Sequence, residues 1–185
     1  MLPLYAAVAQ STSTKGTRVL GVSAGNLFFR SEASTSAFDV ALEPVAGVFF
    51  ANNWAVGVAL PIEYHAFRYK RMDEHHNELI TGVAPWLRFY IPSQSRHRVF
   101  AEAQIGALYN AYWGRQLVYD PLGVPRIGDF KGHDFGGFVR IGAGYSYFLT
   151  PSVAIETMAA YQQGGFTSGY DGLTLTIGLR AYLGQ

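Results

Sequence analysis

The sequence contains no cysteine, which excludes disulfide bonds, thiolate metal sites and cysteine nucleophiles. It is also poor in charge: Lys, Arg, Asp and Glu make up 15 % of its 185 residues, whereas a soluble domain carries about 25 %. The net charge is +1, so there is no electrostatic basis for binding nucleic acid. No run approaches about 18 uninterrupted apolar residues, which excludes a transmembrane helix. Any affinity for a membrane must therefore come from strands.

Aromatic residues, glycine and strict alternation are abundant instead. The chain has 12 Tyr, 13 Phe and 21 Gly. The stretch "RVFAEAQIGALYNAYW", residues 98–113, places apolar side chains at every second position from Val99 to Tyr109. A period of two is that of a β-strand, whose successive side chains point to opposite faces. The run is much longer than the usual five or six residues of a globular strand.

The same alternation predicts eight strands joined by links of alternating length. The short links are residues 51–53, 92–97 and 150–152, and the long ones are 70–78, 113–134 and 163–172. An antiparallel meander with tight turns at one end and long loops at the other produces this pattern. The predicted strands are 17–30, 37–50, 54–68, 78–91, 98–112, 135–149, 153–163 and 173–183.

The two faces of these strands differ in chemistry. One face is apolar and free of charge, with Ile105, Ile141 and Ile177 at its centre. The other combines glycine and alanine with isolated charges of both signs. Eight strands enclose an interior just wide enough for side chains to fill, and buried charges there need partners of opposite sign. We therefore predict an ion-pair network in the lumen, formed by Glu43, Glu63, Arg88, Glu102, Arg140, Glu156 and Arg180.

Aromatic residues gather near the two ends of the predicted strands, as expected for girdles at the two membrane interfaces. The short-turn girdle is predicted to contain Phe49, Phe50, Trp54, Phe89, Tyr90, Tyr147, Phe148 and Tyr182.

Three segments carry a resemblance to a known family: "TGVAPWLRFYIP", "IGAGYSYFLTPSVAIE" and "LTLTIGLRAYLG". Over residues 16–184 the chain resembles the small eight-stranded outer-membrane β-barrels, namely the OmpA-like transmembrane domain and the OmpX-type barrels. The resemblance implies an all-β fold: an eight-stranded antiparallel up-and-down transmembrane β-barrel with a side-chain-filled polar lumen. It also implies the bacterial outer membrane as the location, lipid as the surroundings, and periplasmic chaperones and the barrel-assembly machinery as partners during biogenesis. We expect a monomer.

The chain departs from the family pattern in two places. It ends Tyr182-Leu183-Gly184-Gln185, where family members often end on an aromatic residue that serves as an assembly signal. Three prolines, Pro44, Pro61 and Pro85, fall within predicted strands, where each removes a hydrogen bond from the ladder.

The first residues indicate export. "LPLYAAVAQ" is a short apolar run that contains Ala7-Val8-Ala9, an A-x-A cleavage pattern. We predict a signal-peptide remnant at residues 1–9, an N-terminal lead at 10–16 and a barrel domain at 17–185.

Residues that could carry chemistry are few. "DEHH", residues 73–76, combines acids with imidazoles, but adjacent residues in a loop rarely form a metal site. Glu63 and His65 share a face as an acid–base pair, and a structural ion pair is the favoured interpretation. We predict no catalytic residue, metal or cofactor.

Three functions remain open from the sequence. The favoured one is a non-enzymatic outer-membrane barrel with a structural or surface-interaction role through its long external loops. The second is a small barrel enzyme acting on lipids, or a narrow channel. The third is a soluble lipocalin-type barrel, which would turn its apolar face inward around a ligand.

Overall fold

A computed structural model describes residues 13–184, apart from residue 94 and residues 166–170. The predicted signal-peptide remnant, residues 1–9, lies outside the described residues. The described strands are β1 (Arg18–Ser31), β2 (Thr35–Ala51), β3 (Trp54–Ala59), β4 (Ile62–Tyr69), β5 (Glu74–Tyr90), β6 (His97–Tyr119), β7 (Pro125–Thr150), β8 (Val153–Gly165) and β9 (Gly172–Leu183).

These strands form a closed antiparallel ring. Apart from β3 and β4, each strand pairs with its neighbours in sequence, and β1 also pairs with β9, from Arg18 opposite Leu183 to Ala24 opposite Ile177. β3 and β4 occupy one position in the ring, because both lie between β2 and β5. The nine strands therefore fill eight positions, which confirms the predicted eight-stranded up-and-down barrel.

The predicted third strand, 54–68, is interrupted between β3 and β4. Pro61 lies in the interruption and lacks the N–H that a continuous ladder needs. Neighbouring strands adapt: Leu60 N donates to Pro44 O at 2.9 Å, and Gly82 N donates to Pro61 O at 3.1 Å. The proline that departs from the family pattern thus divides one wall strand without opening the ring.

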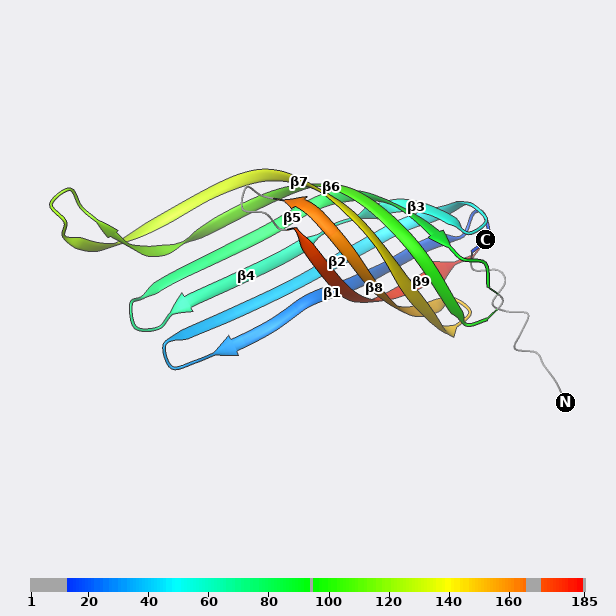
Figure 1. Cartoon of the computed structure of the whole chain (residues 1–185), viewed down its shortest axis with the longest axis horizontal. Helices are drawn as coiled ribbons and strands as arrows, with labels where there is room; N and C mark the ends of the chain where they lie inside the picture. The colour runs from blue at the N-terminus through cyan, green and yellow to red at the C-terminus, as the bar shows by residue number, and fades with distance from the viewer. Residues whose placement is uncertain (1–12, 94, 166–170, 185) are drawn as a thin grey trace.

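The two ends of the barrel differ, as the lengths of the links predicted. Short links lie at the same end as the first residue of β1 and the last of β9, where Asn53 adopts a positive φ of 65° in the turn between β2 and β3. Figure 1 shows the start of β1 and the end of β9 at this end, and the hairpin of β6 and β7 extending far beyond the other strands at the opposite end. We call the two ends the short-turn end and the loop end.

One prediction about the loop end is wrong. Residues 113–134 were expected to form a polar loop, but β6 and β7 remain paired as far as Tyr119 opposite Pro125. The pattern misled because one face of this ribbon mixes charged with apolar side chains, the other is interrupted by glycines, and most side chains on both faces are exposed. Backbone pairing continues without a buried face because the hairpin extends a ladder that the barrel has already aligned.

The faces are arranged as a membrane barrel requires. Ile105, Ile141 and Ile177 are 61 %, 63 % and 57 % exposed on the outside, whereas Glu102, Arg140 and Arg180 are buried inside. A soluble lipocalin-type barrel would show the reverse. Closure leaves no sheet edge in lipid where β1 and β9 are paired. Among the described residues, no helix is long and apolar enough to cross a bilayer.

Candidate functional site in the barrel lumen

Near the short-turn end, a charged network fills the lumen. Arg88 of β5 donates from Nε to Glu102 Oε2 at 2.6 Å and from Nη1 to Glu156 Oε2 at 2.6 Å. Arg180 of β9 places its Nε 3.5 Å from the same Glu156 oxygen. All four side chains are between 4 % and 6 % exposed. Within this network two guanidinium groups face two carboxylates, as burial of ions demands. A third buried guanidinium, that of Arg98, lies 4.9 Å from the Phe148 ring centroid and donates to Ser13 Oγ.

Hydroxyl groups complete this network. The hydroxyls of Tyr182 and Ser146 donate to Glu156 Oε1 at 2.7 and 2.8 Å. Arg88 Nη1 donates to the Tyr90 hydroxyl at 2.8 Å, and the Tyr90 and Tyr182 hydroxyls lie 2.8 Å apart. The sequence prediction did not include these hydroxyls in the network. Alternation itself places Tyr90 and Tyr182 on the lumen face, because each follows a lumen arginine by two residues.

Four residues predicted for the short-turn girdle are inside the barrel instead. Phe49, Tyr90, Phe148 and Tyr182 are buried and pack on one another, with ring centroids 5.6 Å apart for Phe49 and Tyr90 and 5.1 Å for Phe148 and Tyr182. The girdle prediction gave distance from the strand end more weight than the alternation of the two faces. These rings form a plug with the charged network. The girdle prediction holds for the outer-wall residues Phe50, Trp54, Phe89 and Tyr147.

Nearer the loop end, the remaining predicted residues form two smaller groups. Arg140 of β7 donates from Nη2 to both Glu43 carboxylate oxygens of β2, at 2.7 and 2.5 Å. His65 Nδ1 lies 2.8 Å from Asp39 Oδ1, and its Nε2 lies 3.6 Å from Glu63 Oε2. Glu63 therefore lies beside a histidine and not beside an arginine. The structure places the seven predicted residues in three groups, with Asp39 as an additional member.

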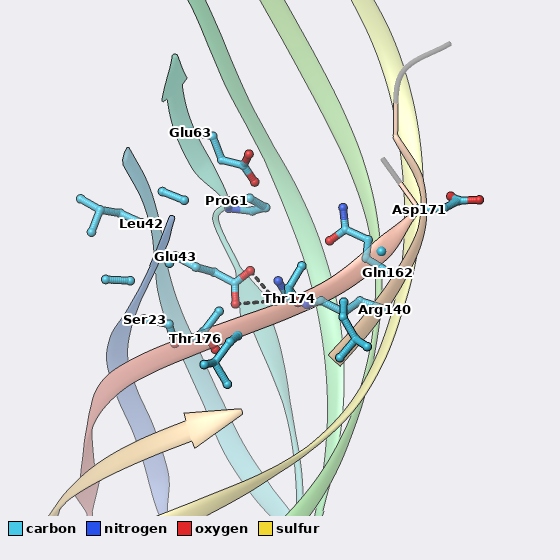
Figure 2. Close-up of a pocket in the computed structure, with 16 residues that line it drawn as sticks. Ser23, Leu42, Glu43, Pro61, Glu63, Arg140, Gln162, Asp171, Thr174 and Thr176 are labelled. Carbon is cyan, nitrogen blue, oxygen red and sulfur yellow. Dashed lines mark hydrogen bonds and ion pairs between the residues drawn. The ribbon is translucent and has the colours of Figure 1, made fainter. Parts of the chain in front are cut away.

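A cavity of about 330 Å³ lies beside the Glu43–Arg140 pair. Figure 2 shows this pair joined across the cavity, with Thr174 and Thr176 of β9 close to it and Glu63 farther along the wall. The lining is partly polar and partly apolar, because it includes Leu42, Leu173 and Leu175 as well as the charged groups.

At the loop end of β5, the "DEHH" stretch does not form a compact cluster. The His76 ring stacks on Phe130 at 5.5 Å, while the adjacent His75 points to the other face of β5 and pairs in register with Arg115. Arg115 donates to Asp129 at 2.7 Å and to Asp73 at 3.2 Å, and the hydrogen bond to Asp129 contributes most to raising the pKa of Arg115. The described part of the chain holds no group of three or more metal-ligating side chains.

Comparison with known proteins gives a likeness of fold. No family model matches the sequence, and no curated protein does. Among solved structures, the chain is similar to the N-terminal β-barrel domain of Pseudomonas aeruginosa OprF, with 14 % identity, a TM-score of 0.49, and 91 % of this chain and 98 % of that chain covered. It is also similar to Ail, the attachment invasion locus protein of Yersinia pestis, with 13 % identity, a TM-score of 0.47, and 92 % and 100 % covered. For Neisserial surface protein A the identity is 15 %, the TM-score 0.44, and the coverage 90 % and 94 %.

The assignment of the fold itself depends on the geometry of this chain. Its strands close into a ring of eight positions, its outer wall is apolar at mid-height, and its charges are paired within. The closed ring, the apolar wall and the polar lumen identify the chain as a member of the transmembrane β-barrel class.

Proposed function

We propose that this chain is an integral, non-enzymatic protein of a bacterial outer membrane that does not conduct and that makes surface contacts through its external hairpin. The observation that carries the proposal is the contrast between the two ends. The short-turn end is filled by a plug of charges and rings, and the loop end extends as a long hairpin (Figure 1). Transmembrane barrels of this kind are found in outer membranes, with short periplasmic turns and longer external loops.

The plug argues against a channel. Arg88, Glu156, Tyr90 and Tyr182 contact one another across the lumen and bring together strands β5, β8 and β9. The guanidinium carbon of Arg88 also lies 4.0 Å from the Phe100 ring centroid. A hydrated path would have to separate these groups and leave buried charges unpaired, at a cost of several kcal/mol.

The geometry around His65 argues against a hydrolase. Its two ring nitrogens face Asp39 and Glu63, which are carboxylates and not nucleophilic hydroxyls. Among the described residues, Nε2 has no hydrogen-bond partner. A hydrolase of the serine type needs a hydroxyl within hydrogen-bond reach of the histidine base. We therefore expect His65→Ala to leave any lipid hydrolysis by the purified protein at its background rate; a fall in rate specific to this variant would favour an enzyme.

The external hairpin supports a role in contacts. Its end carries exposed apolar side chains among paired charges, and a contiguous exposed apolar surface commonly marks an interaction site. Arg126 Nη2 lies 3.4 Å from Asp120 Oδ2 near the tip. The apolar side chains are Leu117, Val118, Tyr119, Leu122, Val124 and Ile127.

Two measurements test the proposal. In planar bilayers, we expect the intact protein to give no resolvable conductance steps, while the Tyr90→Ala/Tyr182→Ala variant, which opens the plug, gives steps. Conductance by the intact protein would refute the plugged lumen.

The second measurement compares attachment of proteoliposomes to polystyrene beads, an apolar probe surface. We expect a variant whose residues 116–128 are replaced by a two-residue turn to attach several-fold less, while it keeps heat-modifiable gel mobility. As a matched control, Asp129→Asn leaves the apolar tip intact and should attach normally. Equal attachment of the intact and shortened proteins would overturn the proposed role of the hairpin.

A further inference from the structure

The wall of the barrel separates on one side toward the loop end. β1 and β9 are paired only as far as Ala24 opposite Ile177. Beyond this point β1 continues along β2 to Ser31, and β9 extends along β8 back to Gly172. The register of β1 against β2 shifts between Gly25 and Phe28, and such a bulge bends a strand. In the described part of the chain, these two strand segments therefore have no ladder between them.

The cavity in Figure 2 lies at this side opening. Its inner lining includes Ser23 of β1 and Thr174 of β9, which belong to the lumen face. Its outer lining includes Leu173 and Leu175, which are 82 % and 73 % exposed on the lipid face. The cavity thus connects the polar lumen with the apolar surroundings of the barrel. A ligand that reaches it from the bilayer must be apolar at one end and polar at the other.

The charges of the lining indicate the polar end. Three carboxylates, those of Glu43, Glu63 and Asp171, line the cavity with one guanidinium, that of Arg140. Glu43 already occupies Arg140 Nη2 with both of its oxygens. Asp171 already accepts a hydrogen bond from Gly164 N at 2.8 Å, and Figure 2 shows its side chain pointing away from the Glu43–Arg140 pair. Glu63, which lies 3.6 Å from His65 Nε2, therefore carries the preference for a head group that is cationic and donates hydrogen bonds. An anionic head group would meet an excess of negative charge.

The volume limits how much of the ligand enters. Pockets for small molecules commonly measure about 300–1,000 Å³, and this one, at about 330 Å³, is at the small end of that range. It holds a head group and a few methylene groups. The rest of the chain must stay in the bilayer, next to Leu173 and Leu175.

We propose that the side opening between β1 and β9 binds a single-chain amphiphile with a cationic, hydrogen-bond-donating head group. The head group enters the lumen beside Glu63 and Glu43, and the alkyl chain lies along the outer wall of β9. The site is independent of the external hairpin, so the variant lacking residues 116–128 keeps it. The tests of this proposal can therefore fail while those of the proposed function succeed, and the reverse.

A tag within the cavity tests the binding directly. Because the chain has no cysteine, Thr174→Cys can carry a single trifluoromethyl label for ¹⁹F NMR in lipid nanodiscs. Titration with dodecylamine at pH 7 should give a saturable shift, and dodecanoate should bind at least tenfold more weakly. The control label at Thr157→Cys, on the lipid face of β8, should show only a shift that rises linearly with the concentration of the amphiphile, without saturation. Identical linear responses at both labels, or tighter binding of dodecanoate, would overturn the proposal.

The charge requirement is tested by one further variant. Glu63→Gln in the Thr174→Cys background removes one carboxylate without changing the size of the side chain. We expect dodecylamine to bind about tenfold more weakly. Unchanged binding would refute the role assigned to the carboxylates.

A cross-link tests the opening itself. A Cβ atom at Gly25 would lie 3.4 Å from Thr176 Cγ2, so Gly25→Cys/Thr176→Cys places two thiols across the mouth of the cavity. With the protein labelled with ¹⁵N and its amide shifts followed by NMR, the oxidised variant should lose at least tenfold in dodecylamine affinity and recover on reduction. The control pair Val22→Cys/Leu179→Cys, in the closed part of the wall, should bind normally in both states. Full binding by the oxidised Gly25/Thr176 variant would refute entry through this opening.

Discussion

Glu156→Gln is the most direct test of the buried plug. Glu156 accepts hydrogen bonds from Arg88, Tyr182 and Ser146 at 2.6 to 2.8 Å and is 3 % exposed. In the plug, Arg88 and Arg180 balance Glu102 and Glu156, and the substitution leaves one positive charge in excess. The glutamine amide also directs two N–H donors toward groups that already donate.

The magnitude follows from the burial. Breaking a buried ion pair by removing one partner costs about 3–5 kcal/mol, because the remaining ion is left without compensation. We expect the free energy of unfolding to fall by about this amount. Urea unfolding of the protein in lipid vesicles, followed by the fluorescence of its three tryptophans, measures the change.

Two controls make the result specific. Asp129→Asn removes an ion pair of similar length, 2.7 Å to Arg115, on the exposed hairpin, and should cost less than about 1 kcal/mol. The double variant Glu156→Gln/Arg180→Met restores charge balance, so its loss should be smaller than the sum of the single losses by about 1 kcal/mol or more. A loss below about 1 kcal/mol for Glu156→Gln, or strict additivity with Arg180→Met, would refute the reasoning.

Two further predictions concern the wall. Ile141→Arg places a charge on the lipid face at mid-height and should reduce the free energy of unfolding in vesicles by about 2–4 kcal/mol. Leu117→Arg on the external hairpin should change the free energy of unfolding by less than about 1 kcal/mol. Equal effects of the two substitutions would contradict the assignment of the faces. Gly106→Val directs a side chain into the Phe138 ring and should lower the free energy of unfolding by about 1–3 kcal/mol through overpacking. Adding Phe138→Leu to this variant should restore part of the lost stability. No recovery in the double variant would show that the clash with the ring does not cause the loss.

The alternation of apolar and polar positions along the chain predicted which side chains face lipid and which face the lumen. Glu102 and Ile105 lie three residues apart, so alternation alone separates them, because successive residues of a strand point to opposite faces. The same rule places Tyr90 and Tyr182 inside as well. Their additional assignment to the short-turn girdle was wrong because position near a strand end was given more weight than alternation.

The contacts between strands could not be predicted in this way. Arg88 and Glu156 are 68 residues apart, and Tyr90 and Tyr182 are 92 apart. Which lumen residues meet depends on how far each strand is shifted against its neighbours when the ring closes. Polarity along the chain also gave no indication that β6 and β7 would remain paired as far as Tyr119 and Pro125.

The sequence by itself determined the strand period, the positions of the short links and the division into an apolar and a polar face, because these depend on residues close together in the chain. The tertiary structure alone decided the pairing of charges within the plug, the length of the external hairpin and the separation of β1 from β9 beyond Ala24 and Ile177. These features follow from the register and curvature of the closed ring, which bring distant strands to the same height and which no local pattern specifies.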